Sequence, residues 1–372
     1  MLAASPGERL RTLRELLGLT QDQLEKMAGV PQSWVSQVET GSRRATEDGL
    51  EAISAVTGTP MKFFYVQPRT VPLDSLRFRK MASASKKTTK RIHAFYGESY
   101  RVTEDMLDRE NYPPPPLPFA TADHLTQDEI DEFASAAREA LGLAPDKPIP
   151  HLTRALERAG VAVAPLMLTD VDGEVNTPTA KHFGASYWGG IGATALICYF
   201  PGSGDRDRFT LGHELGHLIL HTFRPRAEDP ESEAHRFAGA LLVPRVRAKE
   251  ELTEQLSLND YARLKAVWGV SIQALIMRGS AVGNIGDTRK RSLYVQLNQR
   301  QWRKNEPVEV GREHPLLLWR LLTRRFGPRP YVPAGEELAI PPAVLRSIAP
   351  TPERPPERVA APVGAVRQFR PR

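Results

Sequence analysis

The sequence predicts a mainly α-helical protein with a small β-sheet, an α+β fold divided among several domains. The 372 residues suggest two or three domains, at roughly 100–200 residues each. Apolar residues recur at helical spacing along most of the chain, whereas strand-like patterns are few and short. Hydrophobic residues make up 41% and charged residues 25%, which excludes collagen-like, wholly disordered and disulfide-rich proteins. No apolar run approaches the roughly 18 residues of a membrane helix, so we expect no membrane partner.

The charge of the chain is unevenly distributed around a net value of +6. Residues 1–75 carry eight basic and nine acidic side chains, whereas residues 76–101 carry eight basic side chains and one acidic side chain, Glu98. The basic stretch is compatible with nucleic acid binding. Cys198 is the single cysteine, which excludes an internal disulfide and a cysteine-based zinc cluster. This cysteine usage, and a start that does not resemble a signal peptide, predict a cytoplasmic protein.

The N-terminal region contains short helices with clear start and stop signals. Thr20 and Thr46 are suited to cap helix starts, and Gly18 and Gly41 to end helices. A turn at 28–30 contains a glycine and joins two of these helices, which is the helix-turn-helix pattern. The helices predicted here are 6–17, 21–27, 32–39 and 47–57.

The second helix of this motif has side chains suited to reading DNA. Short or amide side chains fit base edges in a major groove, and the start of the preceding helix can meet phosphate. We therefore predict base contacts from Gln32, Ser33, Ser36 and Gln37, and phosphate contacts from Gln21, Arg43 and Arg44. Trp34 and Val35 are expected in the core. A helical bundle that serves only protein contacts is the alternative. Since the region is not basic overall, affinity would depend on a homodimer or on residues 76–101.

The rest of the chain is predicted to form helices around short strands. The predicted helices are 76–112, 125–141, 149–159, 208–221, 231–242, 248–256, 258–268 and 271–279. The predicted strands are 161–165, 185–188 and 195–200, the last two joined as a hairpin by the glycine-rich 189–192. We expect the strand 195–200 to offer a free edge to an extended peptide. From 328 to 372, eleven of 45 residues are proline, which predicts a disordered tail.

The sharpest chemical signal is the motif His-Glu-Leu-Gly-His at 213–217. His213 and His217 are four residues apart, so both imidazoles lie on one side of a helix and can bind one metal ion. Glu214 faces the same cleft and can act as a general base toward water there. The surrounding helix is largely apolar, and two histidines and an acid are costly in it unless a partner satisfies them. We therefore predict a Zn²⁺ site with Glu214 as the catalytic residue.

A catalytic zinc ion needs a third protein ligand and an open position. Glu231 and Glu233 lie on the next predicted helix and project from different faces. Glu231 is favoured because it shares a stripe with Ala234 and Ala238, which let the two helices approach closely, and Glu233 is the fallback. His235 follows Glu231 by one turn and can support it or a ligand histidine.

Three other polar residues of this region have different predicted roles. Asp205 and Asp207 are alternatives as ligands, but we expect them to cap the start of the helix that carries the motif. His221 lies one turn beyond His217 and could extend the cluster. An interaction with the C-terminal end of the helix dipole is the favoured role for this histidine.

These motifs resemble known families. The stretch 207–221, with 231–244 (Glu-Ser-Glu-Ala-His-Arg-Phe-Ala-Gly-Ala-Leu-Leu-Val-Pro), closely resembles the ImmA/IrrE family of zinc metallopeptidases. The stretches 183–188 and 268–276 also resemble that family, and the resemblance spans roughly residues 150–280. One departure is His235, where the family usually has asparagine.

The N-terminal region resembles the Xre or Cro-like helix-turn-helix family. The matching segments are 19–29 (Leu-Thr-Gln-Asp-Gln-Leu-Glu-Lys-Met-Ala-Gly) and 33–41 (Ser-Trp-Val-Ser-Gln-Val-Glu-Thr-Gly), and the resemblance covers about residues 5–65. Together the resemblances imply a helix-turn-helix domain followed by a thermolysin-like minimal zincin that cleaves Xre-type repressors.

The function predicted from these observations is a DNA-binding regulator with a zinc-dependent endopeptidase domain. It would bind operator DNA as a homodimer and cleave a cognate Xre-type repressor, or itself, to control a stress, phage, mobile-element or toxin–antitoxin operon. The alternative is a non-proteolytic repressor or antitoxin whose peptidase-like domain serves as a sensor or dimerisation module. Glu214 favours the first hypothesis because a structural zinc site needs no general base.

The predicted division of the chain follows the motifs and the composition. It comprises a DNA-binding domain at 1–70, a basic helical linker at 71–120, a peptidase domain at 121–245, a C-terminal helical extension at 246–327 and a disordered tail at 328–372.

Overall fold

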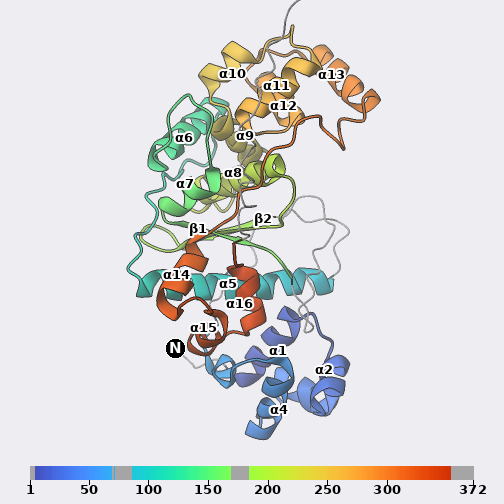
Figure 1. Cartoon of the computed structure of the whole chain (residues 1–372), viewed down its shortest axis with the longest axis vertical. Coiled ribbons are helices and arrows are strands. Elements are labelled where there is room, and N and C mark those ends of the chain that lie inside the picture. Colours follow the sequence, from blue (N-terminus) through green and yellow to red (C-terminus); the bar gives the residue numbers. More distant parts are fainter. Residues whose placement is uncertain (1–4, 69–70, 72–85, 169–183, 353–372) are drawn as a thin grey trace, which may run out of the picture.

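The computed structural model describes residues 5–68, 71, 86–168 and 184–352. The fold is mainly α-helical with one small sheet, as the sequence predicts. The elements follow one another in layers along the long axis of the molecule (Figure 1). The N-terminal helices form one end. A long helix and the last helices of the described chain lie next to them, followed by the sheet and then by the remaining helices.

The N-terminal domain is a compact group of short helices around an apolar core. Thr20 caps the second helix by accepting from the backbone N–H of Gln23, and Gly29 ends that helix in the left-handed conformation at φ 67°. Trp34 and Val35 are buried, which confirms their predicted place in the core. The elements are α1 (Pro6–Leu16), α2 (Gln21–Ala28), α3 (Gln32–Glu39), α4 (Glu47–Thr57) and the 3₁₀ helix η1 (Met61–Tyr65).

The long helix α5 (Lys86–Arg109) lies between the N-terminal domain and the sheet (Figure 1). The buried hydroxyl of Tyr96 donates to the carbonyl of Leu196 at 2.8 Å, and that of Tyr100 donates to the carbonyl of Thr194 at 3.1 Å. The prediction of a linker is therefore wrong for this helix, because it forms part of the core. The basic start of the predicted helix, residues 76–85, lies outside the described residues.

A buried ionic cluster attaches α5 to the elements on either side of it. Arg9 of α1 pairs with Glu98 of α5, and its Nε donates to the carbonyl of Phe63 at 3.0 Å. Arg101 donates to Glu98 at 3.0 Å and to the carbonyls of Leu338 and Ala339. Burial raises the pKa of Glu98, but the two arginines outweigh it and hold that pKa below its usual value.

The sheet contains β1 (Val161–Pro165), β2 (Gly184–Trp188) and β3 (Ala195–Tyr199) in the order β1-β3-β2. β3 pairs with β1 in parallel and with β2 antiparallel. The predicted hairpin is thus present, but the prediction that 195–200 has a free edge is wrong. In the described part of the chain β3 is the central strand, and β2 is the edge strand on that side.

Both faces of the sheet are covered, because alternate side chains of a strand point to opposite faces. Leu196 and Cys198 of β3 belong to a core shared with the N-terminal domain and α5. Ala195, Ile197 and Tyr199 belong to a second core on the other face.

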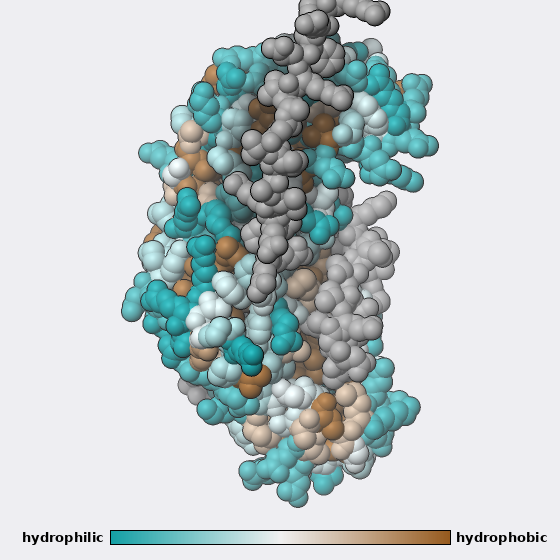
Figure 2. Space-filling view, viewed as in Figure 1, coloured by the Kyte–Doolittle hydropathy of each residue, from teal (hydrophilic) through white to brown (hydrophobic). Residues whose placement is uncertain are grey.

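The second core is formed by side chains of the helices that position the candidate site and of the helices that follow them, up to α13. At the upper right of Figure 2, most of the coloured side chains at this end of the molecule are hydrophilic. None of the helices in the described part of the chain combines the length and the hydropathy that a membrane span requires. The helices are α6 (Gln127–Ala140), α7 (Leu152–Arg158), α8 (Gly204–His221), α9 (Pro230–Leu242), α10 (Arg245–Glu251), α11 (Leu258–Trp268), α12 (Ile272–Ala281) and α13 (Asp287–Gln299).

The last described helices are α14 (Leu317–Phe326), α15 (Tyr331–Leu338) and α16 (Pro342–Ile348). The prediction of disorder is therefore wrong for 331–348, because α15 and α16 bury apolar side chains in the core shared with α5. Their prolines lie at or near helix starts, where a missing backbone N–H costs little. Residues 353–372 of the predicted tail lie outside the described residues.

Candidate metal centre and DNA-binding surface

The 213–217 motif lies on α8, which packs closely against α9. Gly212 and Gly216 face α9. A Cβ at Gly216 would lie 3.0 Å from the ring of Phe237 and 3.2 Å from the Cα of Ala234. The glycine therefore permits the close approach that brings residues of α9 to the histidines of α8.

His213, His217 and Glu231 come together between these helices. Their nearest nitrogen and oxygen atoms all lie within 4.8 Å of one another. The two Nε2 atoms are 3.1 Å apart, and Glu231 oxygens lie 3.5 Å from Nε2 of His213 and 3.3 Å from Nε2 of His217. Two imidazole nitrogens and one carboxylate oxygen match the donor set of a catalytic zinc site, so the residues present fit this ion.

The charge of Glu231 also suits a ligand. Burial raises its pKa, but the adjacent imidazoles of His213 and His217 outweigh this effect and hold the pKa well below its usual value. The carboxyl group is therefore ionised at neutral pH, as a metal ligand must be.

Glu214 lies beside this cluster and contacts the edge strand. It is 3% exposed, and its Oε2 accepts a hydrogen bond from the Ser186 hydroxyl of β2 at 2.7 Å. A Cβ at Gly184 would overlap the Glu214 carboxylate, so the glycine makes room for it. Burial raises the pKa of Glu214 to about 8; the Ser186 hydrogen bond opposes this shift, and the charge of Glu231 adds to it.

The other acidic and histidine residues named from the sequence lie around the cluster. Glu233 points away from it, with Oε2 3.0 Å from Nε2 of His221 and 2.9 Å from Arg224. His235 bonds through Nδ1 to the carbonyl of Glu231 at 2.9 Å, and its ring lies 4.5 Å from that of His213, centre to centre.

Asp205 and Asp207 both lie in the first turn of α8, and the residue in the N-cap position is Ser203. Asp205 binds Nζ of Lys265 at 2.7 Å, and Asp207 accepts from the backbone N–H of Gly202 at 2.7 Å. Both are buried away from the three clustered residues, because their partners belong to α11 and to the loop before α8.

Three residues of the site were missed or given another role from the sequence. Ser186 and Gly184 contact Glu214 across the space between a strand and a helix, and local spacing cannot show that contact. The resemblance of 183–188 to the peptidase family was the available signal. His221 contacts His217 and Glu233, whereas we expected it to interact with the helix dipole.

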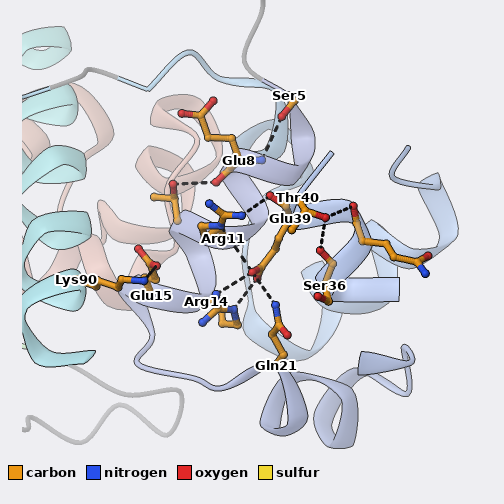
Figure 3. A network of polar contacts seen from close by, with 12 residues as sticks. Ser5, Glu8, Arg11, Arg14, Glu15, Gln21, Ser36, Glu39, Thr40 and Lys90 are labelled. Atoms are coloured by element: carbon orange, nitrogen blue, oxygen red, sulfur yellow. Dashed lines mark hydrogen bonds and ion pairs between the residues drawn. The ribbon is translucent and has the colours of Figure 1, made fainter. Parts of the chain in front are cut away.

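Glu39 organises the helix-turn-helix domain (Figure 3). Its carboxylate accepts from Arg14 at 2.6 and 2.8 Å and from the amide of Gln21 at 3.0 Å. Gln32 in turn donates to Gln21 at 2.7 Å. These bonds tie the starts of α2 and α3 to α1 and so fix the orientation of α3.

The predicted DNA-contacting residues all lie on the surface of this domain. Gln21, Gln32 and Ser36 are partly exposed. The side chains of Gln21 and Gln32 are hydrogen-bonded to each other, whereas those of the other five predicted residues do not form a cluster with them. Those that are exposed are Ser33, Gln37, Arg43 and Arg44.

The fold and the two candidate sites are those of a protein with a helix-turn-helix domain of the DNA-binding kind and a metallopeptidase-like domain. Residues 7–61 match a helix-turn-helix domain family, and residues 163–280 match the family of IrrE N-terminal-like domains of M78 peptidases. The chain is therefore a fusion of an Xre-like helix-turn-helix domain with an ImmA/IrrE-family domain, as its motifs predicted. No curated protein is found to match the chain.

Proposed function

We propose that this chain is a DNA-binding transcriptional regulator whose ImmA/IrrE-type domain is a zinc-dependent endopeptidase. The observation that carries the proposal is the position of Glu214, a buried carboxyl beside a His₂Glu donor set. A site that only held a structural ion would not need such a residue.

His213, His217 and Glu231 would hold the zinc ion, which supplies Lewis-acid activation of a carbonyl group and of water. Glu214 accepts the proton of the attacking water and passes it to the leaving amine. Ser186 holds the carboxylate in one orientation through its hydrogen bond.

The peptide substrate would lie along β2. This strand pairs only with β3 among the described residues, and Ser186 in its middle reaches Glu214. An extended peptide that adds to a sheet edge has its backbone held by main-chain hydrogen bonds. Scissile bonds would then lie next to the clustered histidines. Tyr187 does not belong to such a groove, because its ring packs against Tyr100 with centres 5.0 Å apart.

The DNA partner is a double-stranded operator bound by α3 of two copies of the chain. The exposed Ser33 and Gln37 would read bases, together with Gln32 and Ser36. Gln21, Arg43 and Arg44 would contact phosphates. Such a regulator works in the cytoplasm, and its protein substrate is an Xre-type repressor, either a separate chain or this one.

The test is a Glu214→Gln variant expressed in cells that carry the regulated operon. We expect zinc and DNA binding to persist, and cleavage of the repressor to fall about 10²–10⁴-fold. Repressor length on an immunoblot and transcription of the operon are the measurements. Glu228→Gln, which changes an exposed acid on the neighbouring loop, is the matched control and should behave as the unmodified chain. Identical derepression by Glu214→Gln would instead support the non-proteolytic repressor or antitoxin.

A further inference from the structure

A continuous set of polar contacts leads from His217 away from the candidate metal centre. Nε2 of His217 faces Glu231, whereas Nδ1 lies 3.0 Å from Nδ1 of His221. Nε2 of His221 then lies 3.0 Å from Oε2 of Glu233. Arg224 binds both oxygens of Glu233, with Nη1–Oε2 at 2.9 Å and Nη2–Oε1 at 3.3 Å. We call these four residues the histidine relay.

The positions of the protons in the relay follow from its contacts. A histidine that binds a metal through Nε2 carries its proton on Nδ1, so His217 donates to Nδ1 of His221. His221 must then accept at Nδ1 and carry its own proton on Nε2, which donates to Glu233. Oε2 of Glu233 can accept this hydrogen bond, and Arg224 holds the carboxylate in place through contacts with both of its oxygens. One arrangement of protons therefore satisfies the three contacts from His217 to Arg224.

Burial makes this arrangement hard to replace with water. The side chains of His221 and Arg224 are 1% and 2% exposed, and that of Glu233 is 16% exposed. Arg224 is itself fixed, because it donates to the carbonyl of Asp123 at 2.8 Å and to that of Leu220 at 3.2 Å. The relay thus ends in backbone of the α8 terminus and of the loop before α6.

We propose that His221 and Glu233 are positioning residues for the metal ligand His217. They hold its ring in the orientation and in the tautomer in which Nε2 is unprotonated and faces the candidate zinc site, and Glu233 makes that nitrogen more basic through His221. This inference rests on the proposed zinc site. It assigns Glu233 a role other than that of a ligand, and it replaces the helix-dipole role that we expected for His221.

The test compares two nearly isosteric variants, His221→Gln and His221→Met, in the full chain. Both remove the ring, but glutamine can accept from His217 through its oxygen and donate to Glu233 through its nitrogen, whereas methionine can do neither. We expect the zinc dissociation constant, measured by competition with a chelating dye, to rise about 10–100-fold for His221→Met. For His221→Gln it should rise several-fold less.

A second readout does not depend on affinity. With zinc or cadmium bound, ¹⁵N–¹H correlation of the histidine side chains should show a protected Nδ1–H on His217. This signal should persist in His221→Gln and exchange with water in His221→Met. The thermal midpoint of the metal-free variants checks that both fold. If His221→Met does not fold, the same measurements are made on Glu233→Gln against Glu228→Gln.

The outcomes separate this inference from the zinc site itself. Equal zinc affinities and equal His217 signals for the two variants would overturn the positioning role and leave the zinc site standing. If the unmodified chain binds no zinc, both proposals fail. A selective loss in His221→Met supports the relay.

Discussion

The candidate metal centre and the candidate DNA surface differ in how the fold defines their residues. At the metal centre, His213, Glu214 and His217 are buried, and each contacts polar groups from another element or another turn. On the candidate DNA surface, Ser33 and Gln37 are exposed. A bound partner would set the conformations of these side chains, whereas the residues of the candidate metal centre already lie together in the structure.

The two sites therefore differ in how many structural features each requires. The buried site needs close packing of α8 on α9, a glycine in β2 and a chain of hydrogen bonds behind His217. The DNA surface needs only the correct orientation of α3, which Glu39 supplies through Arg14 and Gln21. Substitutions at the buried site should therefore have larger effects than those on the surface.

The largest difference is expected between the two acids of α9. Glu231→Gln should abolish stoichiometric zinc because it removes a ligand, whereas Glu233→Gln should keep a saturable site with a dissociation constant raised about 10–100-fold. Isothermal titration with zinc measures both. The opposite ranking would make Glu233 the ligand and would contradict the geometry at the cluster.

The buried ion pairs of Glu98 allow the same comparison between buried and exposed residues to be made away from the candidate metal centre. Glu98→Gln leaves Arg9 and Arg101 buried without their carboxylate, and we expect the free energy of unfolding to fall by about 3–5 kcal/mol. Urea unfolding measures this change. Lys26→Gln breaks an exposed pair with Asp22 and is the control, with no change resolved. Equal effects of the two variants would contradict the account of α5 as a buried core helix.

A smaller effect is expected on the DNA surface. Gln37→Ala should weaken binding to the specific operator by about 1–3 kcal/mol and leave binding to random duplexes unchanged. The two affinities are measured at one salt concentration, with the exposed Gln299→Ala of α13 as a control. A parallel loss on specific and random DNA would reduce Gln37 to a residue that positions the domain.

The last prediction concerns the pH dependence of stability at Glu313. Burial raises the pKa of Glu313, but His151, Arg208 and the backbone N–H of Thr153 outweigh it and lower the pKa to about 2. Because its pKa is lower in the folded state, Glu313 contributes stability above about pH 4.5 that is lost as the pH falls toward 2. Unfolding of Glu313→Gln should depend less on pH across this window than unfolding of the unmodified chain. An unchanged slope would show that Glu313 does not carry this contribution.

Local sequence patterns predicted the helices that carry both sites. α3 (Gln32–Glu39), α4 (Glu47–Thr57) and α11 (Leu258–Trp268) have the predicted bounds, because caps and helical periodicity are local signals. The spacing of His213 and His217, and the stripe on which Glu231 lies, likewise depend on one helix at a time. The structure brings these three residues together as that reasoning expected, and their role as ligands stays a prediction.

Contacts between distant elements could not be predicted in this way. The central position of β3 depends on its parallel pairing with β1, and no local pattern encodes that pairing. Ser186 reaches Glu214 only because α8 crosses the edge strand. Proline content suggested disorder for 328–372, yet the prolines of α15 and α16 lie where helices tolerate them. A high proline content alone does not distinguish a disordered tail from short helices whose prolines lie near their first residues.

The central claim is that α8 and α9 form a metal-binding site that is independent of the DNA-binding domain. Metal analysis of the purified unmodified chain and of His217→Ala, with operator binding measured on the same samples, tests it most directly. We predict about one zinc ion per unmodified chain, none held stoichiometrically by His217→Ala, and equal operator affinity for both. Equal zinc contents in the two proteins would contradict the assignment of the site.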